Sequence, residues 1–142
     1  MVSQAIVLDL LARLRDYVGK LRPFQAKAEQ ELVEDYAALW AVERGMQLAA
    51  QCVLDICNHI VSEGSADRPD NYRDLILTAG RLGLIPAEFA QQFSRLAGFR
   101  NVLVHEYAKV DPSEVYRNLR EGLADFDRSA EYVRLLLERR RE

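Results

Sequence analysis

Four polar residues in one apolar segment have side chains suited to acid-base chemistry and to binding an anion. They are Arg100, Asn101, His105 and Tyr107, in the string Arg-Asn-Val-Leu-Val-His-Glu-Tyr. A neutral imidazole, whose ordinary pKa is about 6.5, can take up a proton near neutral pH. The guanidinium of an arginine stays protonated and can hold an anion through several N–H donors. This segment is therefore our candidate for a site.

Arg100 lies on the apolar face of the helix expected to carry this segment. In a helix that runs from Pro86 toward Glu106, the apolar stripe on that face is Phe89, Phe93, Leu96, Leu103 and Tyr107. An unpaired buried guanidinium is energetically costly. We therefore expect Arg100 to have a fixed partner or to point into a polar cleft.

His105 does not project from the same side of this helix as Arg100. Five residues at roughly 100° per residue place the two side chains about 140° apart around the helix axis. Either the helix ends or bends near His105, or a second copy of the chain supplies the missing group across a symmetric interface. Symmetric pairing, as a homodimer, is our working hypothesis.

The wider string resembles the HepT-like HEPN ribonuclease toxins. Arg100, His105 and Tyr107 match the R-x4-H-x-Y signature of that family, and the flanking Gly98-Phe99 and Leu103-Val104 are similar too. R-x4-H alone has little specificity, whereas the string Gly-Phe-Arg-Asn-x-Leu-Val-His-x-Tyr has much more. The likeness extends over most of the chain, because the expected helices follow the same order.

The resemblance implies an endoribonuclease that needs no metal or cofactor, the toxin of a toxin-antitoxin pair that cuts transfer RNA or messenger RNA. His105 would take the proton of a 2′-hydroxyl as it attacks the adjacent phosphate. Arg100 would hold that phosphate and stabilise the charge that gathers on its oxygens. Asn101 would orient the histidine or the phosphate.

Tyr107 is, by the same resemblance, the residue that a cognate antitoxin modifies. In that family a minimal nucleotidyltransferase of the MntA type transfers AMP from ATP to this tyrosine. A bulky anionic adduct beside Arg100 and His105 would fill the cleft and compete for the arginine. Taken without the family, Tyr107 could equally be a core tyrosine with its hydroxyl at the edge. We interpret the intervening Glu106 as a solvated residue at the helix end.

Composition and charge limit what else the chain can be. With 142 residues, 49% hydrophobic and 29% charged, we expect a single domain over residues 1–142. The formal net charge of -3 gives no overall positive field, so contact with RNA requires a local basic cleft. Cys52 and Cys57 are expected to be reduced core residues of a cytoplasmic protein. No segment has the features of a signal peptide or a membrane span.

Apolar periodicity predicts an all-α fold, an antiparallel bundle of about five helices. A first helix is expected from Val7 to Leu21, where Pro23 interrupts it, followed by a polar helix over 25–34 and a long helix from Leu39 to Val61. After a turn-rich loop over 62–70, a short helix from Tyr72 to Leu82 is closed by Gly83 and is followed by the motif helix. The last helix begins at the cap Asp111-Pro112-Ser113-Glu114 and runs to Leu137.

Two further features have both a structural and a functional interpretation. Asp55 and His59 are four residues apart on one helix face. We expect a buried hydrogen-bonded pair that locks the long helix to a neighbour, with a second acid-base or orienting site as the alternative. The run Arg139-Arg140-Arg141 could contact RNA or a partner, but we expect a frayed, solvated tail.

Two other functional classes compete with the nuclease. One is a non-catalytic helical module that accompanies a nucleotidyltransferase and positions its substrate, which the acidic balance of charge favours. The other is a structural dimerisation bundle without a ligand. The intact set of Arg100, His105 and Tyr107 favours the enzyme. The sequence has no glycine-rich phosphate loop, no H-E-x-x-H and no G-x-S-x-G, so nucleotide hydrolysis, zinc chemistry and serine hydrolysis have no support.

Overall fold

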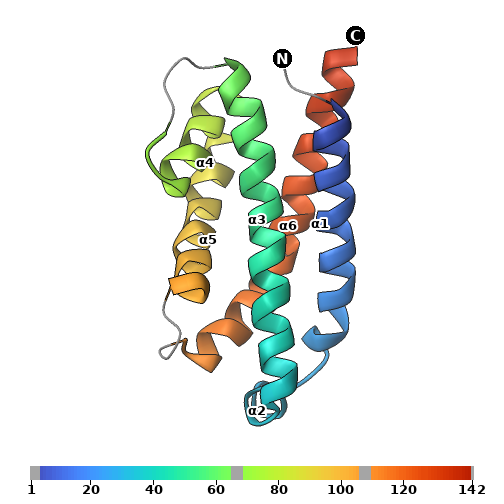
Figure 1. The fold of residues 1–142 in the computed structure, drawn as a ribbon, viewed down its shortest axis with the longest axis vertical. Helices are drawn as coiled ribbons and strands as arrows, with labels where there is room; N and C mark the ends of the chain where they lie inside the picture. Colours follow the sequence, from blue (N-terminus) through green and yellow to red (C-terminus); the bar gives the residue numbers. More distant parts are fainter. Residues whose placement is uncertain (1–3, 65–68, 106–109, 142) are drawn as a thin grey trace.

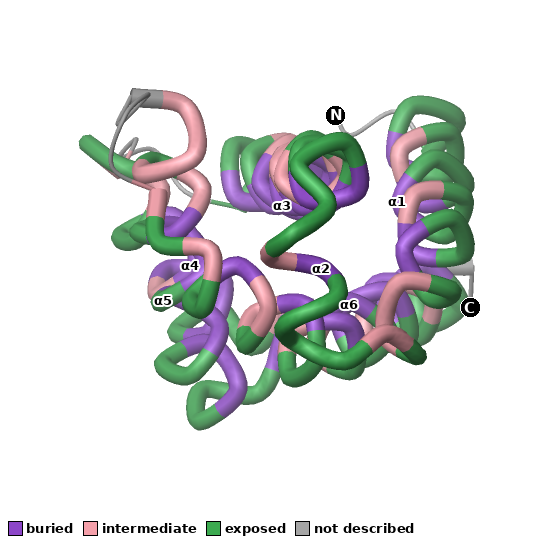
Figure 2. Tube along the Cα trace, turned by 90° about the horizontal axis from the view of Figure 1, so that it is seen from below, coloured by how far each residue is buried: buried purple, intermediate pink, exposed green. Residues whose placement is uncertain are grey.

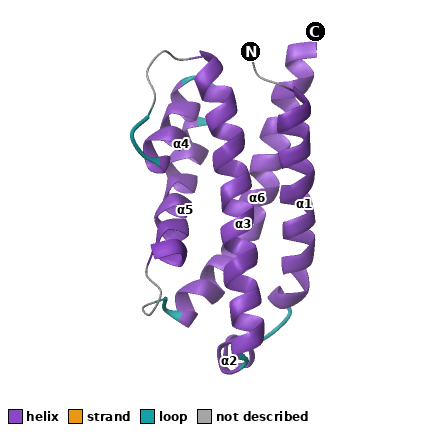
Figure 3. Ribbon diagram, in the orientation of Figure 1, coloured by secondary structure: helices purple, strands orange, loops and turns teal. Residues whose placement is uncertain are grey.

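The computed structural model describes residues 4–64, 69–105 and 110–141, without the side chains of His105 and Arg141. These segments form six α-helices and no strand (Figure 3). The helices are α1 (Gln4–Gln25), α2 (Glu29–Glu34), α3 (Tyr36–Gly64), α4 (Tyr72–Arg81), α5 (Ala87–His105) and α6 (Pro112–Arg141). The all-α prediction is confirmed, and the helix beyond the expected five is explained by α2, which stands as a short separate element.

The long helices form an antiparallel bundle, as predicted (Figure 1). Successive long helices, α1, α3, α5 and α6, alternate in direction, and the short α4 runs antiparallel to α5. The start of α1 and the end of α6 lie at the same end of the bundle. Helix α3 contacts all five other helices. It is therefore the central element against which the candidate site is built.

Helix α3 begins earlier than its apolar pattern predicted, because Asp35 caps it. The Oδ1 atom of Asp35 accepts a hydrogen bond from the backbone N–H of Ala38 at 3.1 Å, and α3 starts at Tyr36 instead of Leu39. Helix α3 buries a stripe of apolar residues along its length: Val42, Met46, Ala49, Val53, Ile56, Cys57 and Ile60. Figure 2 shows buried residues on the faces that the helices turn toward one another.

The prediction that Pro23 interrupts the first helix was wrong, since α1 continues through Pro23 to Gln25. A proline lacks the N–H that an interior helix position donates. Pro23 lies in the last turn, where the helix is about to end and two turn-type hydrogen bonds follow, from Ala26 N–H to the Pro23 carbonyl and from Lys27 N–H to the Phe24 carbonyl. The short α2 after this turn buries only Leu32.

A column of aromatic rings attaches α5 to α6. Phe89 and Phe93 stack at 5.3 Å between centroids, and each makes an edge contact with a ring of α6, Phe89 with Tyr132 at 5.1 Å and Phe93 with Phe126 at 6.1 Å. Such pairs are worth about 0.5–1.5 kcal/mol beyond the area that they bury. The predicted stripe of α5 is thus buried at Phe89, Phe93 and Leu96 and partly buried at Leu103.

Helices α4 and α5 approach closely at Gly80. A Cβ atom on Gly80 would lie 2.6 Å from the Cβ of Ala90, closer than real Cβ atoms come. The turn that joins the two helices contains Gly83, whose φ of 75° is in the left-handed region that glycine adopts without strain. The glycine that was predicted to close the short helix is therefore in place, and Gly80 lets α4 lie directly against α5.

We expect Gly80→Ala to destabilise the protein and Ala90→Gly to compensate. The added methyl should force α4 and α5 apart, and overpacking of this kind costs about 1–3 kcal/mol. In a double-mutant cycle from chemical denaturation, Gly80→Ala with Ala90→Gly should be more stable than the sum of the single effects by a similar amount. Gly19→Ala is the control, because a Cβ there meets nothing within 4 Å. A Gly80→Ala variant as stable as the parent would contradict the close approach.

Both cysteines are free and buried, as predicted. Burial raises the pKa of Cys52 to about 11 and that of Cys57 to about 12, so both are neutral thiols at physiological pH.

The prediction of a frayed C-terminal tail was wrong, because α6 extends to Arg141 and Arg140 donates to Glu63 of α3 at 2.6 Å. Asp111 caps α6 as predicted, accepting from Ser113 N–H at 3.0 Å. Within the described ranges, none of the helices has the length and apolarity that crossing a bilayer requires.

Candidate active site

Arg100 is half-buried on α5 and is held by a chain of polar groups on α3. Its Nε donates to Oε1 of Gln51 at 3.1 Å, and Nε2 of Gln51 donates to Oδ1 of Asp55 at 2.8 Å. The amide of Gln51 therefore presents its oxygen to the guanidinium and its N–H to the carboxylate. The sequence predicted that Arg100 would have a fixed partner, and Gln51 is that partner.

Two further contacts fix the plane of the guanidinium. Nη1 of Arg100 donates to Oδ1 of Asn101 at 3.2 Å, and the guanidinium carbon lies 5.0 Å from the centroid of the Tyr72 ring. Contacts from α3, α4 and α5 together position the group before any ligand arrives. Among the described segments, Arg100 has no ion pair, and only two of its N–H groups donate hydrogen bonds to residues there. The others remain available for an anion.

A polar pocket opens beside the guanidinium. Its volume is about 340 Å³, and it is lined by Asn58, Pro69, Asp70, Asn71, Tyr72, Leu75, Arg100 and Asn101. Amide groups and a positive charge at its wall suit a ligand rich in oxygen acceptors, such as a phosphate. Arg100 thus also has the polar cleft that was the second expectation for it, and Asn101 lines the same cleft.

The remaining two residues of the predicted set are only partly placed. The described part of helix α5 reaches His105, and the residues that follow lie outside the described part of the chain, so the expectation that the helix ends or bends there stays a prediction. The side chain of His105, and Glu106 and Tyr107 altogether, lie outside the described residues. The structure therefore brings Arg100 and Asn101 together, and the catalytic and modification roles of all four residues stay predictions.

The prediction that Asp55 and His59 form a pair was wrong. Asp55 accepts its hydrogen bond from Gln51, one turn earlier on α3, and the two residues share neither a hydrogen bond nor an ion pair. Both side chains are half-buried at most. The reason lies in Arg100, which fixes the orientation of the Gln51 amide so that its N–H points at Asp55.

Gln51 and Tyr72 are the functional candidates that the sequence reasoning missed. Tyr72 was noted only as the start of a short helix, whereas its ring lies under the guanidinium. Gln51 stands between the buried Ala50 and Cys52 in a long apolar helix. A polar residue in such a run could have suggested a partner for Arg100. Among the described residues no cluster of three His, Cys, Asp or Glu could hold a metal ion.

Two nucleases resemble the chain in sequence. Over 119 residues the chain is 27% identical to a tRNA nuclease HepT from Aphanizomenon flos-aquae, covering 84% of this chain and 79% of the relative. Over 129 residues it is 20% identical to an mRNA nuclease HepT from Shewanella oneidensis, covering 91% and 96%.

The fold is also that of a solved toxin. The tri-AMPylated Shewanella oneidensis HEPN toxin in complex with its MNT antitoxin superposes with a TM-score of 0.84, at 19% identity, over 94% of this chain and 99% of that one. The model of the HepT-like family, described as Ribonuclease HepT-like, matches residues 10–133. The resemblance carried by the motif is thereby confirmed, and the chain belongs to the Ribonuclease HepT-like family.

Proposed function

We propose that this protein is the endoribonuclease toxin of a toxin-antitoxin pair and that it cleaves RNA at the Arg100 pocket. The observation that carries the proposal is the guanidinium of Arg100, which three helices hold in place at the wall of a polar pocket, with no ion pair to any residue that the structure describes. The relatives of the chain that carry a functional name are nucleases of transfer RNA and messenger RNA.

The chemistry that these residues support is transfer of the phosphate to the neighbouring 2′-oxygen. His105 takes the 2′-hydroxyl proton, the 2′-oxygen bonds to phosphorus, and the bond to the 5′-oxygen of the next nucleotide breaks as that oxygen gains a proton. Arg100 contacts the non-bridging oxygens, on which negative charge gathers. Because a preorganised cation supplies that stabilisation, the reaction proceeds without a metal ion. Asn101 keeps the guanidinium in plane through its 3.2 Å contact.

The active unit in this proposal is a homodimer. Arg100 and His105 project about 140° apart on a helix, so one copy of α5 does not direct both groups at one phosphate. A two-fold axis beside the end of α5 would place the histidine of one protomer opposite the arginine of its partner. Two equivalent clefts would result from one interface.

The partner in this proposal is a nucleotidyltransferase antitoxin of the MntA type, which silences the toxin by transferring AMP to Tyr107. A structural relative is described as tri-AMPylated and bound to its MNT antitoxin. The adduct carries a phosphate into the neighbourhood of the Arg100 guanidinium, which is an anion site with unused N–H donors.

The direct test is cleavage of total transfer RNA in excess EDTA by the wild-type protein and by an Arg100→Ala, His105→Ala double variant. We expect fragments from the wild type alone, because the double variant lacks both the base and the charge that stabilises the transition state. Mass spectrometry of the wild-type protein before the assay establishes that Tyr107 carries no AMP. Circular dichroism of both proteins establishes equal helix content.

Three results would contradict parts of this proposal. Equal cleavage by the double variant would show that Arg100 and His105 do not catalyse the reaction. Cleavage that stops in EDTA and returns with a divalent cation would contradict the metal-independent mechanism. An unmodified wild-type protein that cleaves neither transfer RNA nor messenger RNA would favour the non-catalytic module.

A further inference from the structure

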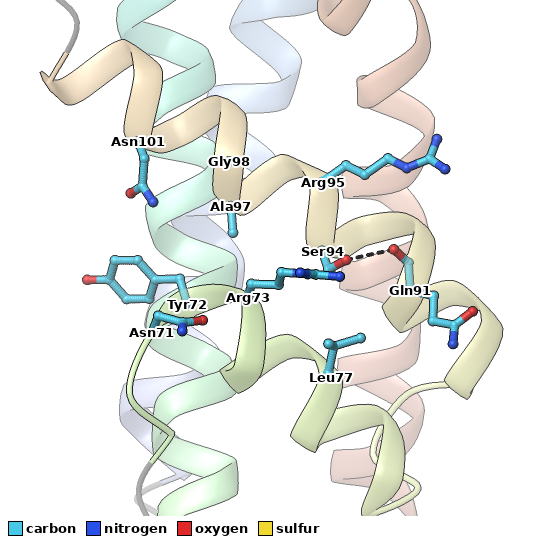
Figure 4. Close-up of a pocket in the computed structure, with 10 residues that line it drawn as sticks. All are labelled: Asn71, Tyr72, Arg73, Leu77, Gln91, Ser94, Arg95, Ala97, Gly98 and Asn101. Carbon is cyan, nitrogen blue, oxygen red and sulfur yellow. Dashed lines mark hydrogen bonds between the residues drawn. The ribbon is translucent and has the colours of Figure 1, made fainter.

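A second groove lies between α4 and α5, beside the Arg100 pocket (Figure 4). Its volume is about 660 Å³, and its lining residues are Asn71, Tyr72, Arg73, Leu77, Gln91, Ser94, Arg95, Ala97, Gly98 and Asn101. This lining contains two arginines and no aspartate or glutamate. On a chain with a formal net charge of -3, the groove is a local concentration of positive charge.

The groove adjoins the pocket that holds Arg100. Asn71, Tyr72 and Asn101 line both hollows. The part of α5 that lines the groove runs from Gln91 to Asn101, about 15 Å at a helical rise of 1.5 Å per residue. A ligand anchored at Arg100 can therefore extend past Asn101 and along α5.

Arg73 supplies a cation that the fold itself does not use. It is exposed and forms no hydrogen bond or ion pair with any residue in the described ranges. Figure 4 shows its side chain reaching from α4 across the groove toward Ser94. The neighbouring Asp74 does not line the groove, and its carboxylate accepts from Nδ2 of Asn71 at 3.1 Å. Arg95 also lines the groove, but its guanidinium extends away from Arg73.

We propose that the α4–α5 groove binds the single-stranded RNA backbone adjacent to the scissile phosphate, with Arg73 contacting one phosphate. The proposal rests on the proposed nuclease function and extends it to a substrate-binding subsite. A concave groove between two packed helices suits an unpaired strand, whereas an A-form duplex is recognised across its wide minor groove. Contacts to phosphate hold a strand without reading its bases. Arg73 is thus a positioning residue that acts on binding and not on the chemical step.

Gly98 provides an independent way to block the groove. It is exposed, and a Cβ atom there would meet nothing within 4 Å, so the space above it is open. Leucine favours a helix over glycine by up to about 1 kcal/mol. Gly98→Leu should therefore fill the groove next to Asn101 without a loss of stability. Gly19→Leu is its matched control, because Gly19 is an exposed glycine of α1 where a Cβ also meets nothing within 4 Å.

The first test measures binding of a fluorescein-labelled single-stranded RNA to proteins in a His105→Ala background, so that the strand is not cut. Arg73→Gln should raise Kd about threefold to tenfold. It should also reduce the slope of log Kd against log salt by about 0.7, the share of one phosphate contact on a single strand. Arg15→Gln makes the same charge change on an exposed residue of α1, across the bundle, and should alter neither value.

The second test measures RNA cleavage by variants that keep His105 and are otherwise wild type. Arg73→Gln and Gly98→Leu should each raise KM and leave kcat within about twofold, whereas loss of a residue that acts in the chemical step lowers kcat. Gly19→Leu should behave as the wild type. Light scattering on each variant follows the oligomeric state.

Several outcomes would overturn the subsite. If the wild type cleaves RNA and Arg73→Gln has the same KM, Kd and salt slope, the proposed subsite is wrong but the proposed nuclease function is not. Loss of a dimer in Gly98→Leu would assign the groove to a second copy of the chain, and loss of antitoxin binding with normal KM would assign it to the antitoxin. If the unmodified wild type neither binds nor cuts RNA, the proposed function fails and the subsite fails with it.

Discussion

Replacing Arg100 by alanine should lower kcat/KM for RNA cleavage by about 100-fold to 1,000-fold, the loss seen when a donor that stabilises transition-state charge is removed. The guanidinium is set in place by Gln51, Asn101 and the Tyr72 ring before substrate binds. Such a group needs little reorganisation as charge develops on the phosphate. The measurement is the initial rate of cleavage of a labelled RNA under single-turnover conditions, together with thermal unfolding of each variant.

Arg100→Lys separates the charge from the shape of the group. A lysine ammonium is a point charge and cannot bond to Gln51 while presenting a planar fork to two phosphate oxygens. We therefore expect it to recover only part of the activity and to stay at least about tenfold below the wild type. Gln51→Leu tests the opposite case, because it keeps the guanidinium and removes its partner at 3.1 Å. Its loss of activity should be smaller than that of Arg100→Ala.

Arg15→Ala is the matched control, since it removes one exposed positive charge far from the pocket and should cleave at the wild-type rate. Arg100→Gln guards against a trivial loss through packing, because it retains part of the half-buried stem. Cleavage by Arg100→Ala within about threefold of the wild type, in a protein with unchanged unfolding, would show that the pocket is not the active site.

The need of Arg100 for a partner could be predicted from the sequence, but the identity of the partner could not. The stripe of Phe89, Phe93 and Leu96 placed Arg100 on the inner face of its helix. Because an unpaired buried cation is energetically costly, a partner for Arg100 had to be expected. Gln51 is 49 residues away in the chain. Which residue of α3 faces Arg100 depends on the rotation and stagger of two packed helices, which local periodicity does not determine.

The incorrect predictions have a common physical cause, since a weak local preference was overridden by its surroundings. An i, i+4 side-chain pair is worth only about 0.2–0.5 kcal/mol. The tertiary contact from Arg100 to Gln51 was therefore enough to divert Asp55 from His59. Pro23 follows the same logic, because a proline two residues before the helix end at Gln25 disturbs only the final turn and leaves the rest of α1 intact.

The α4–α5 groove illustrates what the sequence conceals. Net charge predicted only that any basic cleft would have to be local. Nothing in the pattern distinguishes Arg73 from the other exposed arginines of the chain. Its position in the groove depends on Gly80, which lets α4 lie against α5 and so brings Arg73 beside the helix that carries Arg100.

The second large effect should come from Tyr107→Phe, which we expect to abolish the gain of AMP on incubation with the antitoxin and ATP. AMP transfer requires the phenol oxygen to bond to the α-phosphorus of ATP while pyrophosphate leaves and the phenolic proton is lost. Phenylalanine has no such oxygen but keeps the ring. The variant should therefore fold, retain RNA cleavage and escape silencing. Intact-protein mass spectrometry and a cleavage assay after the incubation read out both consequences.

Chain geometry explains why an adduct at this position would silence the enzyme. Tyr107 is two residues beyond His105 in the sequence, so the covalent chain limits the separation of their Cα atoms to about 8 Å. A phosphate carried on the tyrosine thus stays near the end of the helix that presents Arg100. Like the scissile phosphate, it is an anion that the unused N–H donors of Arg100 can bind. The AMPylated wild type should accordingly bind RNA more weakly than the unmodified protein.

A matched control is Tyr116→Phe, because the Tyr116 hydroxyl is on α6 and already donates to the Lys27 carbonyl at 2.9 Å. This variant should still accept AMP and still be silenced. Persistence of the AMP adduct in Tyr107→Phe would refute Tyr107 as the modified residue. Peptide mapping would then turn first to Tyr72, which lines the pocket and lies under the guanidinium, so that an adduct there would displace Arg100 directly. The two positions differ in one measurable respect: modification of Tyr72 would break the ring contact that holds Arg100, whereas modification of Tyr107 leaves that contact intact and only occupies the anion site.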